Sequence, residues 1–335
     1  MRSELASLLV VLTALVLGGC GSPYVPARSE ADLRPPIAPG APEAPPTSPL
    51  EHRSGFFEGA GHAKLFEQSW RDASARPRAA LVVVHGLKDH GSRYRGLAEA
   101  LAPRGIAVHA LDLRGHAHSE GRRVAIEDFD QYVEDVAIFT ARVQAEHPNE
   151  PVFLFGHSMG GAIATLVVLE KRPAIRGLVL SGAALAAPGF FTRGGVHVTN
   201  ALAPSARVFQ LDLEDFSRDP NVVREGRADP LVYQPAAPAH TANEVLGAIA
   251  KIDDAMNRLD VPTLILHGDA DKVTPPEGSR ALYRRASSAD KSLKLYPRLY
   301  HDLLHEPERA LVIGDIATWI EARLSRGETA AAEGR

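Results

Sequence analysis

The chain carries a serine in a glycine-rich setting that suits a nucleophile. Residues 156–161 read Gly-His-Ser-Met-Gly-Gly, which places Ser158 in a G-x-S-x-G motif. An apolar run precedes the motif and a helical pattern follows it, so the sequence predicts a strand, a sharp turn at Ser158 and a helix. Glycines permit both the tight turn and close packing of helix on strand. The alternative, a glycine-rich turn of a nucleotide-binding fold, does not account for the partners that follow.

A serine hydroxyl needs a base, and the base needs an orienting carboxylate. Two later loops, each after a predicted strand, supply the candidates in the order serine, acid, histidine. In the first loop we favour Asp271 over Asp269, which we expect to support the turn. In the second we favour His301 over His305, which lies nearer the last helix and is expected to face solvent. The sequence thus predicts a triad of Ser158, Asp271 and His301.

A third loop follows the first predicted parallel strand and reads HGLKDHGSRY over residues 85–94. With the start of the helix after the nucleophile, such a loop supplies backbone N–H groups that stabilise a developing oxyanion. The expected donors are the N–H groups of Leu87 and Met159. The side chains expected to brace this loop are His85, His90 and Arg93.

No cofactor is expected from this chemistry, and no metal site is predicted. His116 and His118 form a His-x-His pair, but they lack a third ligand at suitable spacing and fit loop stabilisation better. The net charge of −4 argues against a nucleic-acid partner.

The elements that must position these residues alternate along the chain. Near-continuous apolar strands separated by helices indicate a mostly parallel sheet covered on both faces. A strand pair within Phe56–Trp70, around Gly59-Ala60-Gly61, predicts an antiparallel hairpin ahead of it. The strand candidates are Ala80–Val84, Ile106–Leu111, Val152–Phe155, Gly177–Leu180, Thr263–Leu266 and Leu293–Tyr296. The helical candidates are Tyr94–Ala102, Ile126–Glu146, Met159–Glu170, Glu277–Arg285 and Glu308–Leu324.

The alternation breaks over residues 186–250, which are too long for a simple loop in a compact domain. We therefore expect an inserted cap within a catalytic domain spanning 51–325. The apolar residues of this stretch are Phe190, Phe191, Val196, Val198 and Leu202.

The two ends of the chain read differently from the domain. Residues 1–20 resemble a bacterial lipoprotein signal peptide, because a short apolar run ends at Leu17-Gly-Gly-Cys20 and Cys20 is the single cysteine. The proline-rich residues 21–50 predict a disordered linker, and 326–335 a disordered tail. The sequence thus predicts a protein of the bacterial cell envelope, anchored to a membrane through lipidated Cys20. Gly21 and Ser22, with no aspartate after the cysteine, favour the outer membrane, facing the periplasm or the surface.

Taken together, seven segments resemble the monoacylglycerol lipase family of serine aminopeptidase-like α/β-hydrolases. The resemblance covers residues 54–322 and implies the α/β-hydrolase fold, the triad and oxyanion donors above, and a cap that admits one acyl chain. Ala117 departs from the family, whose members usually have glycine there. The matching segments are HGLKDHGSRY at 85–94, DLRGHAHSEGRR at 112–123, DFDQYVEDV at 128–136, GHSMGG at 156–161, ADPLVY at 228–233, HGDADKVTP at 267–275 and YHDLLHEPE at 300–308.

The expected activity is hydrolysis of a carboxylic ester with one long acyl chain, such as a monoacylglycerol, through an acyl-enzyme on Ser158. Lysophospholipids and short-chain esters are the alternatives, with Arg193 or Arg207 as candidate contacts to a phosphate. A non-catalytic lipid-binding protein would lack a triad member, and all three are present. The sequence does not specify the oligomeric state.

Overall fold

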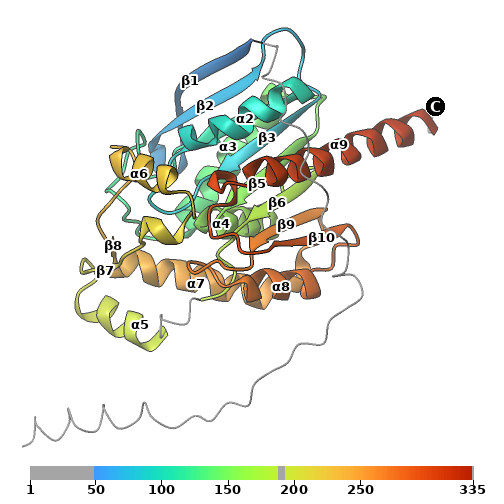
Figure 1. Cartoon of the computed structure of the whole chain (residues 1–335). Coiled ribbons are helices and arrows are strands. Elements are labelled where there is room, and N and C mark those ends of the chain that lie inside the picture. The colour runs from blue at the N-terminus through green and yellow to red at the C-terminus, as the bar shows by residue number, and fades with distance from the viewer. Residues whose placement is uncertain (1–48, 188–192, 334–335) are drawn as a thin grey trace, which may run out of the picture. The chain divides into compact units, whose positions relative to one another are not determined.

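The computed structural model of the chain describes residues 49–187 and 193–333 (Figure 1). The predicted signal peptide with Cys20, nearly all of the predicted linker, and Phe190 and Phe191 of the predicted cap lie outside the described residues.

An eight-stranded sheet forms the centre of the catalytic domain, in the order β1-β2-β4-β3-β5-β6-β9-β10. β1 and β2 form the antiparallel hairpin and β2 runs antiparallel to β4, whereas the strands from β4 to β10 are parallel. The predicted parallel sheet and hairpin are therefore confirmed. The strands are β1 (Leu50–Glu58), β2 (Lys64–Asp72), β3 (Ala79–Val84), β4 (Ile106–Leu111), β5 (Val152–His157), β6 (Gly177–Ser181), β9 (Thr263–Gly268) and β10 (Lys291–Tyr296).

Helices cover both faces of this sheet and create two hydrophobic cores. Successive side chains of a strand point to opposite faces, so Val82 and Val84 of β3 join one core while Leu81 and Val83 join the other. α3, α4 and α7 contribute to the first core, and α2 and α9 to the second. The helices are α2 (Arg95–Leu101), α3 (Asp130–Glu146), α4 (Met159–Leu166), α5 (Arg193–Leu202), α6 (Pro220–Ala228), α7 (Ala239–Ala255), α8 (Pro276–Arg285) and α9 (Arg309–Glu333).

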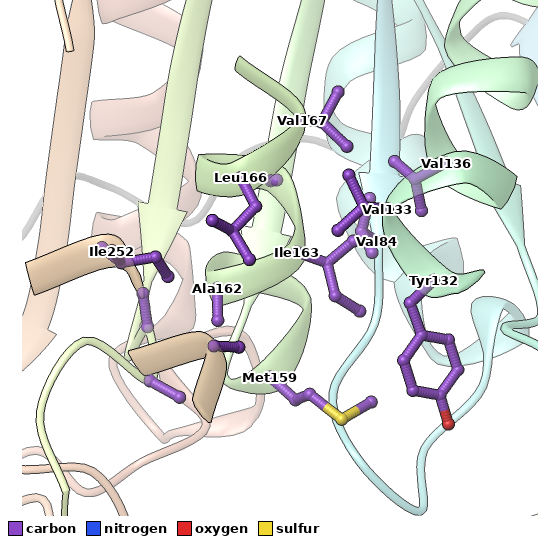
Figure 2. Packing of buried hydrophobic residues seen from close by; sticks show 14 of the residues in the cluster. Val84, Tyr132, Val133, Val136, Met159, Ala162, Ile163, Leu166, Val167 and Ile252 are labelled. Carbon is purple, nitrogen blue, oxygen red and sulfur yellow. The ribbon is translucent and has the colours of Figure 1, made fainter. Parts of the chain in front are cut away.

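α4 is the helix that follows Ser158, and it is buried from end to end. Figure 2 shows Ile163 of α4 beside Val84 of β3 and Val133 of α3, with Ile252 of α7 on the other side of the helix. Burying one such aliphatic side chain contributes about 1.5–3 kcal/mol. The packing therefore fixes the N-terminus of α4, where the predicted nucleophile and one oxyanion donor lie.

The helices differ from the sequence prediction at their ends. α2 is shorter by one residue at each end, α8 begins one residue earlier, and α4 ends at Leu166, where a π-helical segment continues to Lys171. α3 begins at Asp130 rather than Ile126. α9 continues to Glu333, beyond the predicted end at Leu324 and through most of the segment predicted as a disordered tail. Ala330-Ala331-Ala332 are strong helix formers and favour the extension, whereas Gly327 opposes it.

The insertion predicted over 186–250 consists of small elements between β6 and β9. Its apolar residues do not all face inward, because Val196 is buried but Val198 and Leu202 are exposed. No helix among the described residues has the length and apolar character needed to span a bilayer. The elements added here are β7 (Arg207–Phe209), a 3-10 turn η6 (Leu213–Asp215) and β8 (Ala237–Pro238), together with α5, α6 and α7.

Candidate active site

Ser158 occupies a strained turn between β5 and α4. Its φ and ψ are 55° and −123°, a region that a residue with a side chain rarely adopts and that costs about 1–3 kcal/mol. Hydrogen bonds hold the turn, since the Ser158 N–H donates to Ser181 O (3.1 Å) and Ser158 O accepts from Gly161 N (2.9 Å) and Ala184 N (3.0 Å). The strain keeps the hydroxyl at the carboxyl end of the parallel strands.

The glycines around Ser158 are required by close approach of backbone to backbone. A Cβ on Gly160 would lie 2.2 Å from Val84 O, and one on Gly156 would lie 2.4 Å from Gly160 O. No side chain fits at either position. These glycines therefore let α4 start directly against the ends of β3 and β5.

The structure brings Ser158, His301 and Asp271 into one hydrogen-bonded line. The Ser158 hydroxyl lies 2.8 Å from His301 Nε2, and His301 Nδ1 lies 2.8 Å from Asp271 Oδ2. The arrangement assigns Nδ1–H as donor to the carboxylate and Nε2 as acceptor from the hydroxyl. The side chains of both partners of the His301–Asp271 pair are fully buried.

The alternative acid and base lie elsewhere. Asp269 accepts a hydrogen bond from the Arg298 N–H and supports the turn. His305 lies 3.2 Å from Arg93 O through Nε2 and is partly buried rather than solvent-facing. Neither residue contacts Ser158 among the described interactions.

Several groups keep Asp271 charged despite its burial. Burial raises the pKa of this carboxyl, but the His301 charge and hydrogen bonds from His267 and His301 outweigh that effect and hold the pKa well below its usual range. The N–H groups of Val273 and Thr274 also donate to Asp271 Oδ1, at 2.8 and 2.9 Å. Asp271 is thus an ionised partner able to stabilise an imidazolium on His301.

Two residues around His301 escaped the sequence analysis. The Thr274 hydroxyl lies 2.9 Å from Asp271 Oδ2 and 3.1 Å from His301 Nδ1. Phe216 comes from the cap and packs edge-on against the His301 ring, with centroids 5.1 Å apart. Thr274 could have been found from the sequence, because it follows Asp271 by three residues. Phe216 could not, because it is 85 residues from His301 and belongs to no motif.

The two predicted oxyanion donors border the same cavity as Ser158. Leu87 and Met159 both line it. Within the described part of the chain, neither N–H is recorded as donating to another group. Both are therefore available to an incoming carbonyl oxygen.

The side chains expected to brace the Leu87 loop make bracing contacts. His85 Nδ1 lies 2.7 Å from Gly86 O, and its Nε2 accepts from the Leu113 N–H at 2.9 Å. His90 reaches the cap through Asp229 Oδ2 at 2.9 Å. Arg93 bonds to two buried carboxylates, Asp89 at 3.2 Å and Asp302 at 3.0 Å.

His116 and His118 are engaged within their own loop. His116 Nδ1 lies 3.0 Å from Arg114 O, and His118 Nδ1 lies 3.1 Å from Asp112 Oδ2. Ala117 between them has a φ of +38°. An alanine here therefore takes the left-handed conformation that glycine adopts more easily.

The cavity beside Ser158 is narrow and largely apolar. Helix α7 supplies much of one wall, and the segments after β3, β5, β6 and β9, together with Leu211 of the cap, supply the rest. Such a lining suits a hydrocarbon chain rather than a charged group. Its residues are Leu87, Ser158, Met159, Ala184, Ala186, Leu211, Ala242, Val245, Leu246, Ile249, Val273 and Thr274.

A second, more polar cavity shares Leu87 and Leu211 with the first. Lys88 lines it, is only 6% exposed, and its Nζ lies 3.3 Å from Gln234 O. Burial lowers the pKa of Lys88 to about 8, against the attraction of Asp212. Arg93 also lines this cavity but is paired with Asp89 and Asp302. Lys88 is thus the lining cation that no carboxylate holds at close range among the described contacts, and the sequence did not single it out.

The arginines named as phosphate contacts are not seen at this cavity. Arg207 donates to Tyr233 Oη and to Ala236 O within the cap. The side chain of Arg193 lies outside the described residues.

Known proteins resemble the chain over most of its length. Residues 75–308 match the family described as "Serine aminopeptidase, S33". The chain is 36% identical over 271 residues to the monoacylglycerol lipase of Mycolicibacterium smegmatis, which covers 80% of this chain and 96% of that protein. It is 35% identical over 272 residues to the monoglyceride lipase of Homo sapiens, covering 79% of this chain and 89% of that one.

A solved structure agrees with the architecture. The crystal structure of the Paleococcus ferrophilus monoacylglycerol lipase superimposes with a TM-score of 0.68 at 29% identity, covering 77% of this chain and 99% of that one. The predicted α/β-hydrolase fold is confirmed.

Proposed function

The chain belongs to the serine aminopeptidase S33 family of α/β-hydrolases, and on that premise we propose that it is a carboxylic ester hydrolase that cleaves monoacylglycerols. The observation that carries the proposal is the hydrogen-bonded line from Ser158 through His301 to Asp271, opening on an apolar cavity. Relatives named monoacylglycerol or monoglyceride lipases support the substrate class.

The reaction follows from the geometry in two halves. His301 Nε2 takes the Ser158 proton as Oγ attacks the ester carbonyl, and the N–H groups of Leu87 and Met159 stabilise the oxyanion. The imidazolium, held by Asp271, gives its proton to the leaving alcohol, which leaves an acyl-enzyme. Water then attacks with His301 again as base, and the fatty acid leaves as Ser158 regains its proton.

An ester substrate fits these surroundings better than a peptide with a free N-terminus. An ammonium would need a free carboxylate at the site. Asp89 and Asp302 are both paired with Arg93, and the charge of Asp212 acts on Lys88. The acyl chain finds apolar walls from α7 instead.

The test compares the parent chain with Ser158→Ala. We expect a fluorophosphonate probe to label the parent but not the variant. The variant should release fatty acid from monoacylglycerol roughly 10⁴- to 10⁶-fold more slowly than the parent. Ser54→Ala, an exposed serine on β1, is the matched control and keeps both. An unlabelled parent, or a fully active Ser158→Ala, contradicts the proposal.

Lys88 favours a second candidate substrate, a lysophospholipid with an anionic head group. The alcohol portion of a bound ester must leave the apolar cavity, and the polar cavity adjoins it across Leu87 and Leu211. A buried ammonium attracts a phosphate more strongly than one in water does. The acyl-enzyme chemistry is the same for both substrates.

A further inference from the structure

Two histidines meet in a groove on the first-core face of the sheet. His109 lies on β4 and His147 directly follows α3, 38 residues later. Their Nε2 atoms are 2.9 Å apart and the ring planes stand at 82°. Glu146 adds a carboxylate whose Oε2 lies 4.0 Å from His109 Nδ1. One ligand atom from each of the three residues lies within 4.8 Å of the others.

The groove around this cluster is wide and carries charges of both signs. Its volume is about 650 Å³, and glutamates and arginines both line it. Arg53 and Arg71 are paired with Glu51. The width of the groove lets a small hydrated cation enter from solvent. The charged residues that line it besides the cluster are Glu51, Arg53, Glu67, Arg71, Arg76 and Glu150.

The contact between the rings fixes how they share a proton. A neutral imidazole has one N–H and one nitrogen lone pair, so without a metal one Nε2–H donates to the other Nε2. When a cation binds both Nε2 atoms, that proton moves to Nδ1 of its own ring, and each imidazole stays neutral.

We propose that His109, His147 and Glu146 form a binding site for a divalent transition-metal cation, of which Zn²⁺ fits best. Two imidazoles and a carboxylate are ligands that zinc accepts, with water in the fourth position. Tetrahedral Zn–N bonds of ~2.0–2.1 Å separate two nitrogens by roughly 3.3 Å. The two Nε2 atoms therefore need to part by about 0.4 Å, and the rings need to turn toward a cation that lies off the line between them. The C-terminal end of α3 adds negative potential beside the cation.

Such a cation would tie the middle of β4 to the end of α3. None of its three ligands lines the cavity at Ser158, so its role is structural and separate from ester hydrolysis. The sequence hides the site because one ligand lies in a strand far from the other two.

The test measures metal binding directly. Zn²⁺ and Co²⁺ are titrated into the full-length chain carrying Cys20→Ser, which removes the single thiol. We expect one equivalent of either ion to bind, and Co²⁺ to show the intense visible bands of tetrahedral coordination. His147→Gln should weaken binding at least ~10-fold. His62→Gln, at an exposed histidine paired with Glu58, is the matched control and should bind as the parent does.

A second readout covers variants that fold poorly. His109 is buried, so His109→Gln can lose stability for that reason alone. The test therefore relies on His147→Gln, because His147 is partly exposed. Zn²⁺ should raise the melting temperature of the parent and of His62→Gln but not of His147→Gln. No binding to the parent, or equal binding and equal thermal shift in His147→Gln, overturns the proposal.

Discussion

Lys88 lies in the oxyanion loop after β3 and has two energetically unfavourable features. Its φ of +70° suits glycine better than lysine, and its ammonium is almost fully buried. Both raise the free energy of the folded chain. A cation kept at such a position beside the acyl cavity is consistent with a role in binding the head group.

We predict that Lys88→Met lowers kcat/KM for 1-acyl-glycerophosphoglycerol by ~10-fold or more and changes it little for a monoacylglycerol of equal chain length. The pKa of Lys88, about 8, predicts a second effect, on the pH dependence. As pH rises through this value the Lys88 ammonium loses its proton, so the parent's preference for the permanently anionic substrate should fall. Kinetics with both substrates from pH 6 to 9 measure both effects.

Lys171→Met, at an exposed lysine paired with Glu134, is the control for loss of a positive charge. Equal losses on the two substrates would show that Lys88 only stabilises the fold.

Some site residues can be recognised from the neighbouring sequence, and others cannot. Ser158 sits in a motif, and Asp271 and His301 follow strands in the order that the chemistry requires, so the sequence predicts them. Phe216 and Lys88 act through neighbours that only the folded cap brings near. No local pattern specifies such contacts.

At the scale of elements, Arg93 joins two catalytic loops. It follows the Leu87 loop and bonds to Asp89 there and to Asp302 beside His301. Burial raises the pKa of Asp89, but Arg93 and other charges outweigh it and lower the pKa to about 2. Burial likewise raises the pKa of Asp302, but the charges of His305 and Arg93 outweigh it and lower this pKa.

We predict that Arg93→Met lowers the free energy of unfolding by about 3 kcal/mol at pH 7, because it removes the cation that two buried carboxylates share. Asp302 keeps His305 and Asp89 keeps the Tyr94 hydroxyl as partners. In the parent both folded-state pKa values lie below the unfolded ones, so their stabilisation is complete above about pH 4 and is lost as pH falls further. In the variant, burial is no longer opposed by Arg93, so both carboxyl pKa values are higher than in the parent. The difference in free energy of unfolding between parent and variant should therefore narrow on acidification.

Urea denaturation at pH 7, 6 and 5 measures this gap. Arg95→Met, at an exposed arginine paired with Glu99, should change stability by less than about 1 kcal/mol. A gap for Arg93→Met that stays constant with pH would contradict the electrostatic explanation.

Element types were easier to predict than element ends. Apolar runs identified β3, β4, β5, β6 and β9, because strands buried on both faces leave a continuous hydrophobic pattern. β10 lies at the edge of the sheet, is only partly buried, and shows a shorter apolar run that begins after its first residues. α9 exceeds its prediction because the apolar pattern that marked its end stops at Leu324, whereas the helix continues through the polar and alanine residues that follow.

At the scale of the whole molecule, we propose that lipidated Cys20 anchors the chain in the bacterial cell envelope, at the outer membrane. The proline-rich residues between Cys20 and β1 would then act as a tether, spanning up to roughly 90 Å at ~3.1 Å per residue if extended. That reach would let the domain meet lipid esters away from its anchor point.

We predict that Cys20→Ser moves the protein from the membrane to the soluble fraction of broken cells, because the acyl chains that hold it are absent. Its activity on a water-soluble ester should match the parent's. Immunoblots of the two fractions measure the change, with Ser22→Ala as the variant that stays in the membrane. A parent found in the soluble fraction, or Cys20→Ser retained with the membrane, contradicts the anchor.

Phe216 and α7 leave the walls of the two cavities with unequal freedom to change. The Phe216 ring borders the polar cavity and rests on His301, and its carbonyl accepts from the Asp302 N–H at 2.8 Å, so remodelling the cap there disturbs proton transfer. Ala242, Val245 and Ile249 on α7 border the acyl cavity without touching the relay. Among descendants of this protein, adaptation to longer or shorter fatty acids should accordingly accumulate along α7, while the wall at Phe216 changes slowly.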